Sequence, residues 1–248
     1  MCFQKSAQQS LRAYRSGDTI EIEIMAFNYW QKFEEKGIYH IYNHSVSDKS
    51  LFQEESDYEF FLEKVELYLL PYLDVYAYCL MPNHFHLLAK IRRYNQEIVN
   101  LLQKENTKAA RKFLEVGNTH YNNFLEDQMR RLFSSHALKY KGKYGNDGAL
   151  FQQRFKRVKI LSETIILNKI AYVHHNPIHH NFAAVYEDWK YSSYNAFLSE
   201  KTSKIARMEI LNWLGDGDVR LGKQIFKEFH ESYKLESGEN WQIDFDNW

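Results

Sequence analysis

The chain has 248 residues and a formal net charge of +0, with 44% apolar and 26% charged residues. This length and composition suit one large globular domain, or a domain with an appendage. No apolar run approaches the roughly 18 residues of a membrane span, and no signal peptide is visible. Two cysteines, Cys2 and Cys79, argue against a disulfide framework. We therefore expect a cytoplasmic protein without a membrane partner.

Positive charge is concentrated in one segment of this neutral chain. Between residues 130 and 159 only Asp147 is acidic, and the basic residues are Arg130, Arg131, Lys139, Lys141, Lys143, Arg154, Lys156, Arg157 and Lys159. Such a segment, interspersed with aromatic residues, is typical of a face that binds a polyanion. It is also compatible with a solvated surface loop, and charge alone leaves both interpretations open.

The first half of the chain reads as strand, helix, strand, strand. Alternation from Thr19 to Ile24 is compatible with an edge strand, and residues 37–44 are rich in β-formers and predict the first strand of the main sheet. Ser56 or Asp57 is expected to cap a helix that Pro71 ends. Strands follow at 73–80 and 84–91, joined by a turn at Pro82 and Asn83.

The second half adds helices and a basic strand. Helical periodicity is present at 95–113 and 122–139, glycines mark a loop at 141–148, and residues 150–160 predict a strand. Ser162 is expected to cap a helix that ends before Pro177. A last helix is expected at 218–233, in an acidic region. The order predicts an α+β fold: a ferredoxin-like antiparallel sheet with helices packed on one face, plus a helical C-terminal appendage.

Two histidines share one face of the strand that begins at residue 84. Side chains alternate along a strand, so His84 and His86 point one way while Phe85 and Leu87 point the other. Two such histidines are commonly structural residues, but they could also form half of a metal site. Their spacing alone does not decide between these roles.

A tyrosine and an amide share a face of the helix after Ser162. Tyr172 and Asn176 are four residues apart, away from the apolar stripe, and Lys169 lies on the same side. Tyrosine can act as a covalent nucleophile at phosphorus if a cation favours the phenolate. Two imidazoles and one amide oxygen would leave positions on Mg²⁺ or Mn²⁺ for phosphate oxygens. Packing is the competing explanation for Tyr172.

Five ordered stretches resemble the REP-associated tyrosine transposases, relatives of the single-tyrosine transposases of the HUH endonuclease class. They span about residues 37–198 and are Tyr39-His40-Ile41-Tyr42-Asn43, Tyr78-Cys79-Leu80-Met81-Pro82-Asn83-His84-Phe85-His86-Leu87-Leu88, Leu150-Phe151-Gln152-Gln153-Arg154-Phe155-Lys156, Tyr172-Val173-His174-His175-Asn176-Pro177 and Trp189-Lys190-Tyr191-Ser192-Ser193-Tyr194. Two features depart from the family pattern. His44 stands where the family tends to have Arg, and Asn181 lies where a turn glycine is usual.

The resemblance implies a metal-dependent enzyme that cleaves and rejoins single-stranded DNA at repeat hairpins. His84, His86 and Asn176 would hold Mg²⁺ or Mn²⁺, and Tyr172 would form a 5′-phosphotyrosine link. Candidate DNA contacts on the first strand and in the basic region are Tyr39, His40, Asn43, Arg130, Arg131, Lys143, Arg154, Lys156, Arg157 and Lys169. The partner would be single-stranded or hairpin DNA made of palindromic repeats.

The expected organisation is an N-terminal extension (1–36), a catalytic domain (37–200) and an acidic helical appendage (201–248). The chain could act as a monomer or as a homodimer, with the tyrosine helix in the same chain or exchanged between chains. Two other functions stay open at this point. One is a non-catalytic protein that binds hairpin DNA or RNA on the same fold, and the other is a phosphodiesterase in which water is the nucleophile.

Overall fold

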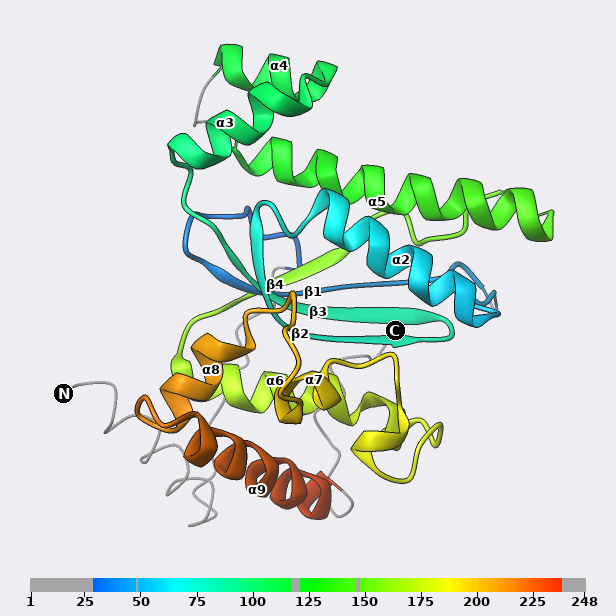
Figure 1. The fold of residues 1–248 in the computed structure, drawn as a ribbon. Helices are drawn as coiled ribbons and strands as arrows, with labels where there is room; N and C mark the ends of the chain where they lie inside the picture. The colour runs from blue at the N-terminus through cyan, green and yellow to red at the C-terminus, as the bar shows by residue number, and fades with distance from the viewer. Residues whose placement is uncertain (1–28, 48, 117–120, 146–147, 238–248) are drawn as a thin grey trace.

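The computed structural model describes residues 29–47, 49–116, 121–145 and 148–237, so Cys2 and the predicted edge strand at 19–24 lie outside the described residues. Within them the chain forms a four-stranded antiparallel sheet in the order β2-β3-β1-β4 (Figure 1). Its strands are β1 (Ile38–His44), β2 (Leu73–Met81), β3 (His84–Ile91) and β4 (Lys156–Ile160). This order and the antiparallel pairing confirm the predicted α+β, ferredoxin-like sheet.

Helices surround this sheet. They are α2 (Glu55–Tyr68), α3 (Gln96–Glu105), α4 (Lys108–Val116), α5 (Tyr121–Tyr144), α6 (Glu163–His179), the 3₁₀ helix η2 (Tyr186–Asp188), α7 (Tyr194–Leu198), α8 (Arg207–Leu214) and α9 (Val219–Ser237). The long helix predicted at 95–113 is two helices, because Asn106 ends α3 in the left-handed conformation and Thr107 caps α4 through its hydroxyl. Among the described residues, none of these helices is long and apolar enough to cross a membrane.

One face of the sheet packs against α2 to α5. Strand alternation sends Tyr39 and Ile41 of β1 and Phe85 of β3 into this layer, where they are fully buried. Phe61 of α2 meets Phe85 with ring centroids 5.1 Å apart. These helices form the two connections that precede β4, and they lie on one face as predicted.

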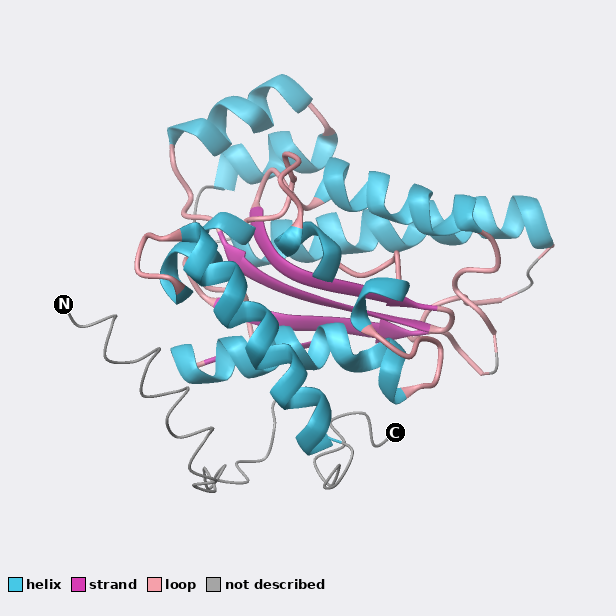
Figure 2. Cartoon of the chain, turned by 60° about the horizontal axis from the view of Figure 1, so that its bottom comes forward, coloured by secondary structure: helices cyan, strands magenta, loops and turns pink. Residues whose placement is uncertain are grey.

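The opposite face is also covered, by the helices that follow β4 (Figure 2). Cys79 and Leu88 of the sheet share a buried cluster with Ile170 and Val173 of α6. The prediction that the helices pack on one face is therefore wrong for α6 and the helices after it. The physical reason lies in the strands themselves, since β2 and β3 are buried on both faces and need a second apolar layer.

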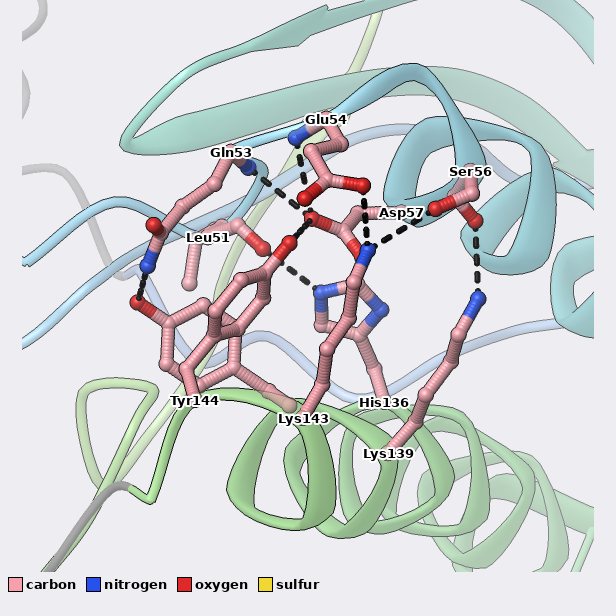
Figure 3. Close-up of polar contacts among 10 residues, drawn as sticks. Leu51, Gln53, Glu54, Ser56, Asp57, His136, Lys139, Lys143 and Tyr144 are labelled. Atoms are coloured by element: carbon pink, nitrogen blue, oxygen red, sulfur yellow. Dashed lines mark hydrogen bonds and ion pairs between the residues drawn. The ribbon is translucent and has the colours of Figure 1, made fainter.

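The ends of α2 and α5 are joined by a polar cluster (Figure 3). The N-cap of α2 is Glu54 rather than the predicted Ser56 or Asp57. Asp57 instead accepts hydrogen bonds from the Glu54 N–H (3.1 Å) and the Tyr144 hydroxyl (2.8 Å), and it pairs with Lys143 (3.2 Å). Burial acts to raise the pKa of the Asp57 carboxyl, but these hydrogen bonds together outweigh burial and lower that pKa.

Helix α6 carries the predicted tyrosine and extends past its predicted end. Ser162 caps it as predicted, accepting from the Ile165 N–H at 3.4 Å. The helix does not end before Pro177 but continues to His179. Pro177 has no N–H to donate to the Val173 carbonyl, and the helix ends two residues later. Asn181 then adopts the left-handed conformation (φ 59°), as predicted for the turn.

The C-terminal helices α8 and α9 pack against α6 rather than standing apart. Phe226 and Phe229 of α9 and Leu211 of α8 are buried in the cluster that contains Ile170 of α6. The boundary predicted at residue 200 stays a prediction, but the helices beyond it share a core with the tyrosine helix.

Candidate active site

The two predicted metal-ligating histidines lie side by side on β3, facing α6. His84 and His86 are buried, and their ring centroids are 5.1 Å apart. Asn83, in the turn that precedes β3, places its Oδ1 atom 2.8 Å from His84 Nδ1. Because a carbonyl oxygen only accepts, His84 carries its hydrogen on Nδ1, which leaves a lone pair on Nε2.

Asn176 of α6 presents an oxygen to that lone pair. Its Nδ2 atom donates to the Tyr172 carbonyl oxygen (2.9 Å), which turns Oδ1 toward His84 Nε2 at 3.4 Å. Burial, with smaller effects from His44 and His180, lowers the pKa of His84 to about 3, so the ring is neutral and has a single hydrogen. Two acceptor atoms therefore face each other in a buried site, which is the arrangement that a cation between them would stabilise.

His86 contributes a second nitrogen with no hydrogen-bond partner. Its Nδ1 atom lies 3.0 Å from His40 Nε2 on the neighbouring strand, and its Nε2 atom is buried without a partner among the described residues. Burial holds the pKa of both His40 and His86 well below the ordinary value. A neutral imidazole whose second nitrogen is fixed by a neighbouring group is the usual form of a metal-bound histidine.

The donor set lacks the four side-chain ligands of a structural zinc site. No group of three or more His, Cys, Asp or Glu side chains suited to a metal occurs in the described part of the chain. The set that does converge is His84, His86 and the Asn176 oxygen. It leaves coordination positions for oxygen atoms of a substrate.

Tyr172 lies beside this set within the same chain. Its ring centroid is 5.6 Å from that of His86 and 5.7 Å from that of His40, and its side chain is only 3% exposed. Lys169, one turn earlier, places Nζ 4.5 Å from the centre of the tyrosine ring. At this distance the ammonium makes a cation–π contact with the tyrosine ring. The structure thus brings together Tyr172, the Lys169 ammonium and the side chains of the three predicted metal ligands.

A buried chain of hydrogen bonds holds the other side of α6. His230 of α9 donates from Nδ1 to the Phe226 carbonyl (2.8 Å), so its Nε2 atom accepts from His174 Nδ1 (2.9 Å). His174 Nε2 in turn accepts from the Ser193 hydroxyl (2.7 Å), and Ser193 Oγ accepts from the Tyr78 N–H of β2 (2.9 Å). Each donor and acceptor has one consistent role. The chain therefore fixes the rotation of α6 between α9 and the sheet.

Two predicted DNA contacts, Lys156 and Lys169, lie close to this site, and a third, Arg154, lies beside Trp30 at the sheet edge. Tyr42 of β1 is paired with His86 on one side and with Lys156 of β4 on the other, so all three side chains point to the α6 face. Lys156 Nζ lies 5.9 Å from the Tyr42 ring. Arg154 is exposed just before β4, and Lys169 lies above Tyr172. The predicted residue His40 is also here, but it contacts His86 rather than the surface.

The predicted contacts on α5 lie on the other face of the sheet (Figure 1). Arg130 pairs with Asp127 (3.4 Å), although its side chain is 70% exposed. Arg131 pairs with Glu105 (3.8 Å), and Lys143 belongs to the cluster at the start of α2. The basic segment therefore does not form one continuous surface, because Lys156 of β4 faces α6 whereas Arg157 of β4 and the cations of α5 lie on the other side of the sheet.

Three predicted DNA contacts have side chains that are buried and bonded within the protein. Tyr39 is fully buried, and its hydroxyl donates to the Lys32 carbonyl (2.7 Å). Asn43 donates to the Gln152 carbonyl (3.2 Å). Arg157 pairs with Glu126 and is stacked against Phe33. All three have odd residue numbers, and on β1 and β4 the odd-numbered side chains face away from α6. Strand alternation could have predicted this orientation.

Sequence reasoning gave no role in the site to three groups that the structure draws attention to. His44 stacks on His84 (4.5 Å between ring centroids), and His180 lies 5.2 Å from His84. Trp30, far from any motif, lies 5.9 Å from Arg154. Alternation along β1 places His44 on the same face as His40. Its position near the site could therefore have been predicted. Trp30 gave no such signal.

No protein-family model matches the chain. A protein of Haemophilus influenzae that carries the name of a REP-associated tyrosine transposase is 24% identical over 145 residues, which cover 58% of this chain and 69% of the relative. The predicted resemblance to the REP-associated tyrosine transposases is confirmed. The solved structure of a REP-associated tyrosine transposase bound to a REP hairpin aligns with a TM-score of 0.47 and 12% identity, over 69% of this chain and 85% of that chain.

The stretches that resemble the REP-associated tyrosine transposases meet around the site. The segment that starts at Trp189 follows β2: the indole N–H donates to the Leu80 carbonyl (3.1 Å), and the Leu80 N–H donates to the Tyr191 carbonyl (3.0 Å). Ser193 then joins Tyr78 to His174. The closing motif therefore links the strand before the histidine pair to the helix that carries the tyrosine.

Proposed function

We propose that this chain is a metal-dependent DNA transposase that cleaves and rejoins single-stranded DNA at repeat hairpins through a covalent link to Tyr172. One observation carries the proposal. Within a single chain, Tyr172 lies 5.6 Å from His86, whose partnerless Nε2 atom shares a buried site with the facing acceptors of His84 and Asn176. The relative from Haemophilus influenzae, named as a transposase, supports the same reaction class.

The cation would be held by His84 Nε2, His86 Nε2 and Asn176 Oδ1. When bound, Mg²⁺ or Mn²⁺ would polarise the phosphate group and offset charge that develops on its oxygens. The burial that keeps both histidines neutral also keeps their lone pairs available near neutral pH. His40 fixes the ring of His86 from behind, so its role is to position a ligand rather than to contact DNA.

Tyr172 would supply the nucleophile. Its phenol oxygen attacks the phosphorus atom, forming a tyrosine O–P bond while the bond from phosphorus to the 3′ oxygen breaks. The phenol loses its proton, which Lys169 facilitates by favouring the phenolate, and the departing oxygen takes up a proton to become a 3′-OH. Attack by a 3′-OH on the phosphotyrosine reverses these steps and rejoins DNA.

Hairpin DNA is the proposed substrate. The solved structure of the similar transposase is described as bound to a REP hairpin. In this chain Arg154 and Lys156 lie at the edge of the sheet beside the site, where they would contact phosphates. Because Tyr172 and His86 meet within one chain, we propose that a monomer contains the complete site.

The test is covalent capture of DNA. Fluorescent hairpins made from the short palindromic repeats of the genome that encodes the chain are incubated with protein and Mn²⁺ and separated on a denaturing gel. The expected result is a protein–DNA adduct that EDTA abolishes. Tyr172→Phe is expected to form no adduct while binding the hairpin within about twofold of wild type, since it loses only the nucleophilic oxygen.

Other products would contradict the mechanism. A Tyr172→Phe variant that still forms the adduct would exclude Tyr172 as the nucleophile. A free 5′-phosphate without an adduct would identify water as the nucleophile. The burial of Tyr172 (3% exposed) favours one second candidate, a non-catalytic hairpin-binding protein. Tight binding that is insensitive to EDTA, with no cleavage by wild type, would support that candidate.

A further inference from the structure

Trp30 is an exposed aromatic residue held rigidly at the outer edge of the sheet. Its side chain is 49% exposed, which is unusual for a tryptophan. Its backbone forms a parallel bridge with Arg157 of β4, and the Arg157 N–H donates to the Tyr29 carbonyl at 2.7 Å. The segment that carries Trp30 is therefore fixed along the edge strand. The exposure of the ring is not explained by a loose chain.

Cations and aromatic rings alternate from Trp30 inward. The Arg154 guanidinium lies 5.9 Å from the Trp30 ring, and the rings of Trp30 and Tyr29 are 6.4 Å apart. Lys156 Nζ lies 5.0 Å from the Tyr29 ring and 5.9 Å from the Tyr42 ring. Lys156 thus lies between an aromatic residue at the sheet edge and one inside the sheet.

The same series reaches the candidate active site. The Tyr42 ring lies 5.7 Å from His86, and His86 lies 5.6 Å from Tyr172. The side chains of Tyr42, His86 and Lys156 are on one face because their residues are paired across three neighbouring strands. A continuous series of rings with interspersed cations therefore connects an exposed tryptophan to the proposed nucleophile.

We propose that Trp30 and Tyr29, with Arg154 and Lys156, form a binding site for the unpaired bases of single-stranded DNA that leads to Tyr172. That the ligand is single-stranded DNA rests on the proposed function. Single-stranded nucleic acid is bound by this combination: aromatic side chains stack on bases of any sequence, and cations beside them neutralise the phosphates. The hairpin stem would be held elsewhere, and this edge would hold the flanking strand.

Two oligonucleotides distinguish the contribution of base stacking to binding from the contribution of phosphate charge. One is a fluorescent twelve-nucleotide thymidine oligomer, and the other has the same phosphates but abasic sugars. Wild type is expected to bind the thymidine oligomer more tightly, by roughly fivefold to 100-fold for one or two stacked bases. Trp30→Ala is expected to remove most of this preference, while Trp30→Phe retains most of it. Arg154→Ala is expected to weaken binding of both oligomers about equally.

Matched variants control for folding and for general charge. Leu138→Ala removes another exposed apolar side chain, on α5, and Arg220→Ala removes an exposed cation on α9; both should bind the thymidine oligomer like wild type. An unchanged base preference in Trp30→Ala, at wild-type melting temperature, would overturn the proposal, as would a wild type without preference. Adduct formation is scored separately. If wild type forms no adduct, the mechanism through Tyr172 is contradicted but the proposed binding site is not.

Discussion

At the scale of single residues, the site depends on which nitrogen atoms carry hydrogen. Asn83 fixes the hydrogen of His84 on Nδ1, so the Nε2 atom faces Asn176 as an acceptor. The neighbouring ring, His86, is fixed by His40. Each proposed ligand nitrogen is therefore oriented by a partner on its other nitrogen, and removing such a partner should weaken metal binding without removing a ligand.

We expect His40→Phe to lower the affinity for Mn²⁺ by about 10-fold to 100-fold, because the hydrogen bond that orients His86 is lost. Phenylalanine keeps an aromatic ring in the place where His40 stacks on Tyr42. Titration followed by electron paramagnetic resonance of free Mn²⁺ measures the change. His136→Phe is the matched control, since His136 is a buried histidine that bonds to the Leu51 carbonyl far from the site. Equal Mn²⁺ affinity in His40→Phe and wild type would contradict this role.

Much of the site was predictable from residue spacing, and its exceptions have a physical cause. Alternation on β3 and the four-residue interval on α6 place His84, His86, Tyr172 and Asn176 correctly, because each interval belongs to one element. Contacts between elements did not follow from spacing. Arg157 reads as a basic strand residue like Lys156, but only the fold shows that Glu126 of α5 neutralises it.

At the scale of elements, the close approach of α8 and α9 supports the tyrosine helix. A Cβ atom added at Gly222 would lie 2.1 Å from the Leu211 carbonyl oxygen, so only glycine fits between these helices. The sequence predicted a helix at 218–233 correctly. It did not predict that this helix packs against α6, because an amphipathic pattern shows that a face is buried but not which element covers it.

We expect Gly222→Ala to destabilise the fold by at least about 1–3 kcal/mol, since the methyl group would push α9 away from α8. Urea unfolding followed by circular dichroism measures the loss. Gly142→Ala provides the matched control, because a Cβ atom at Gly142 of α5 meets nothing within 4 Å. That variant should gain roughly 0.5–1 kcal/mol from helix propensity. Equal stability of Gly222→Ala and wild type would show that the helices separate without cost.

At the scale of the whole molecule, buried neutral histidines make stability depend on pH. Burial is the largest cause that lowers the pKa in each of eight histidines: His40, His44, His84, His86, His136, His174, His175 and His230. The pKa of His44 and His175 falls to about 4, and that of His84 and His230 to about 3. In the unfolded chain these rings titrate near pH 6.5.

The free energy of unfolding should therefore be constant above about pH 7 and fall steeply below about pH 6.5. Below that pH the unfolded chain binds protons that the folded chain does not, and each such histidine removes up to about 1.4 kcal/mol per pH unit until its folded pKa is reached. Urea unfolding at pH 7.5, 6.5 and 5.5 measures the effect. Wild type should lose several kcal/mol between the last two values, and His136→Phe should show a shallower dependence. Equal stability at all three values would contradict the prediction.

The hydrogen-bond chain through His174 and His230 has a consequence for the order in which the protein is made. Synthesis proceeds from the N-terminus, so β3 and α6 emerge from the ribosome before α9. Until His230 is present, His174 lacks the partner that fixes the rotation of α6. A nascent chain that already contains His84, His86 and Tyr172 thus has the link from His174 to Ser193 but lacks the link from His174 to α9. The last turns of α9 complete the support of the candidate active site, and translation that stops before them yields a chain without this support.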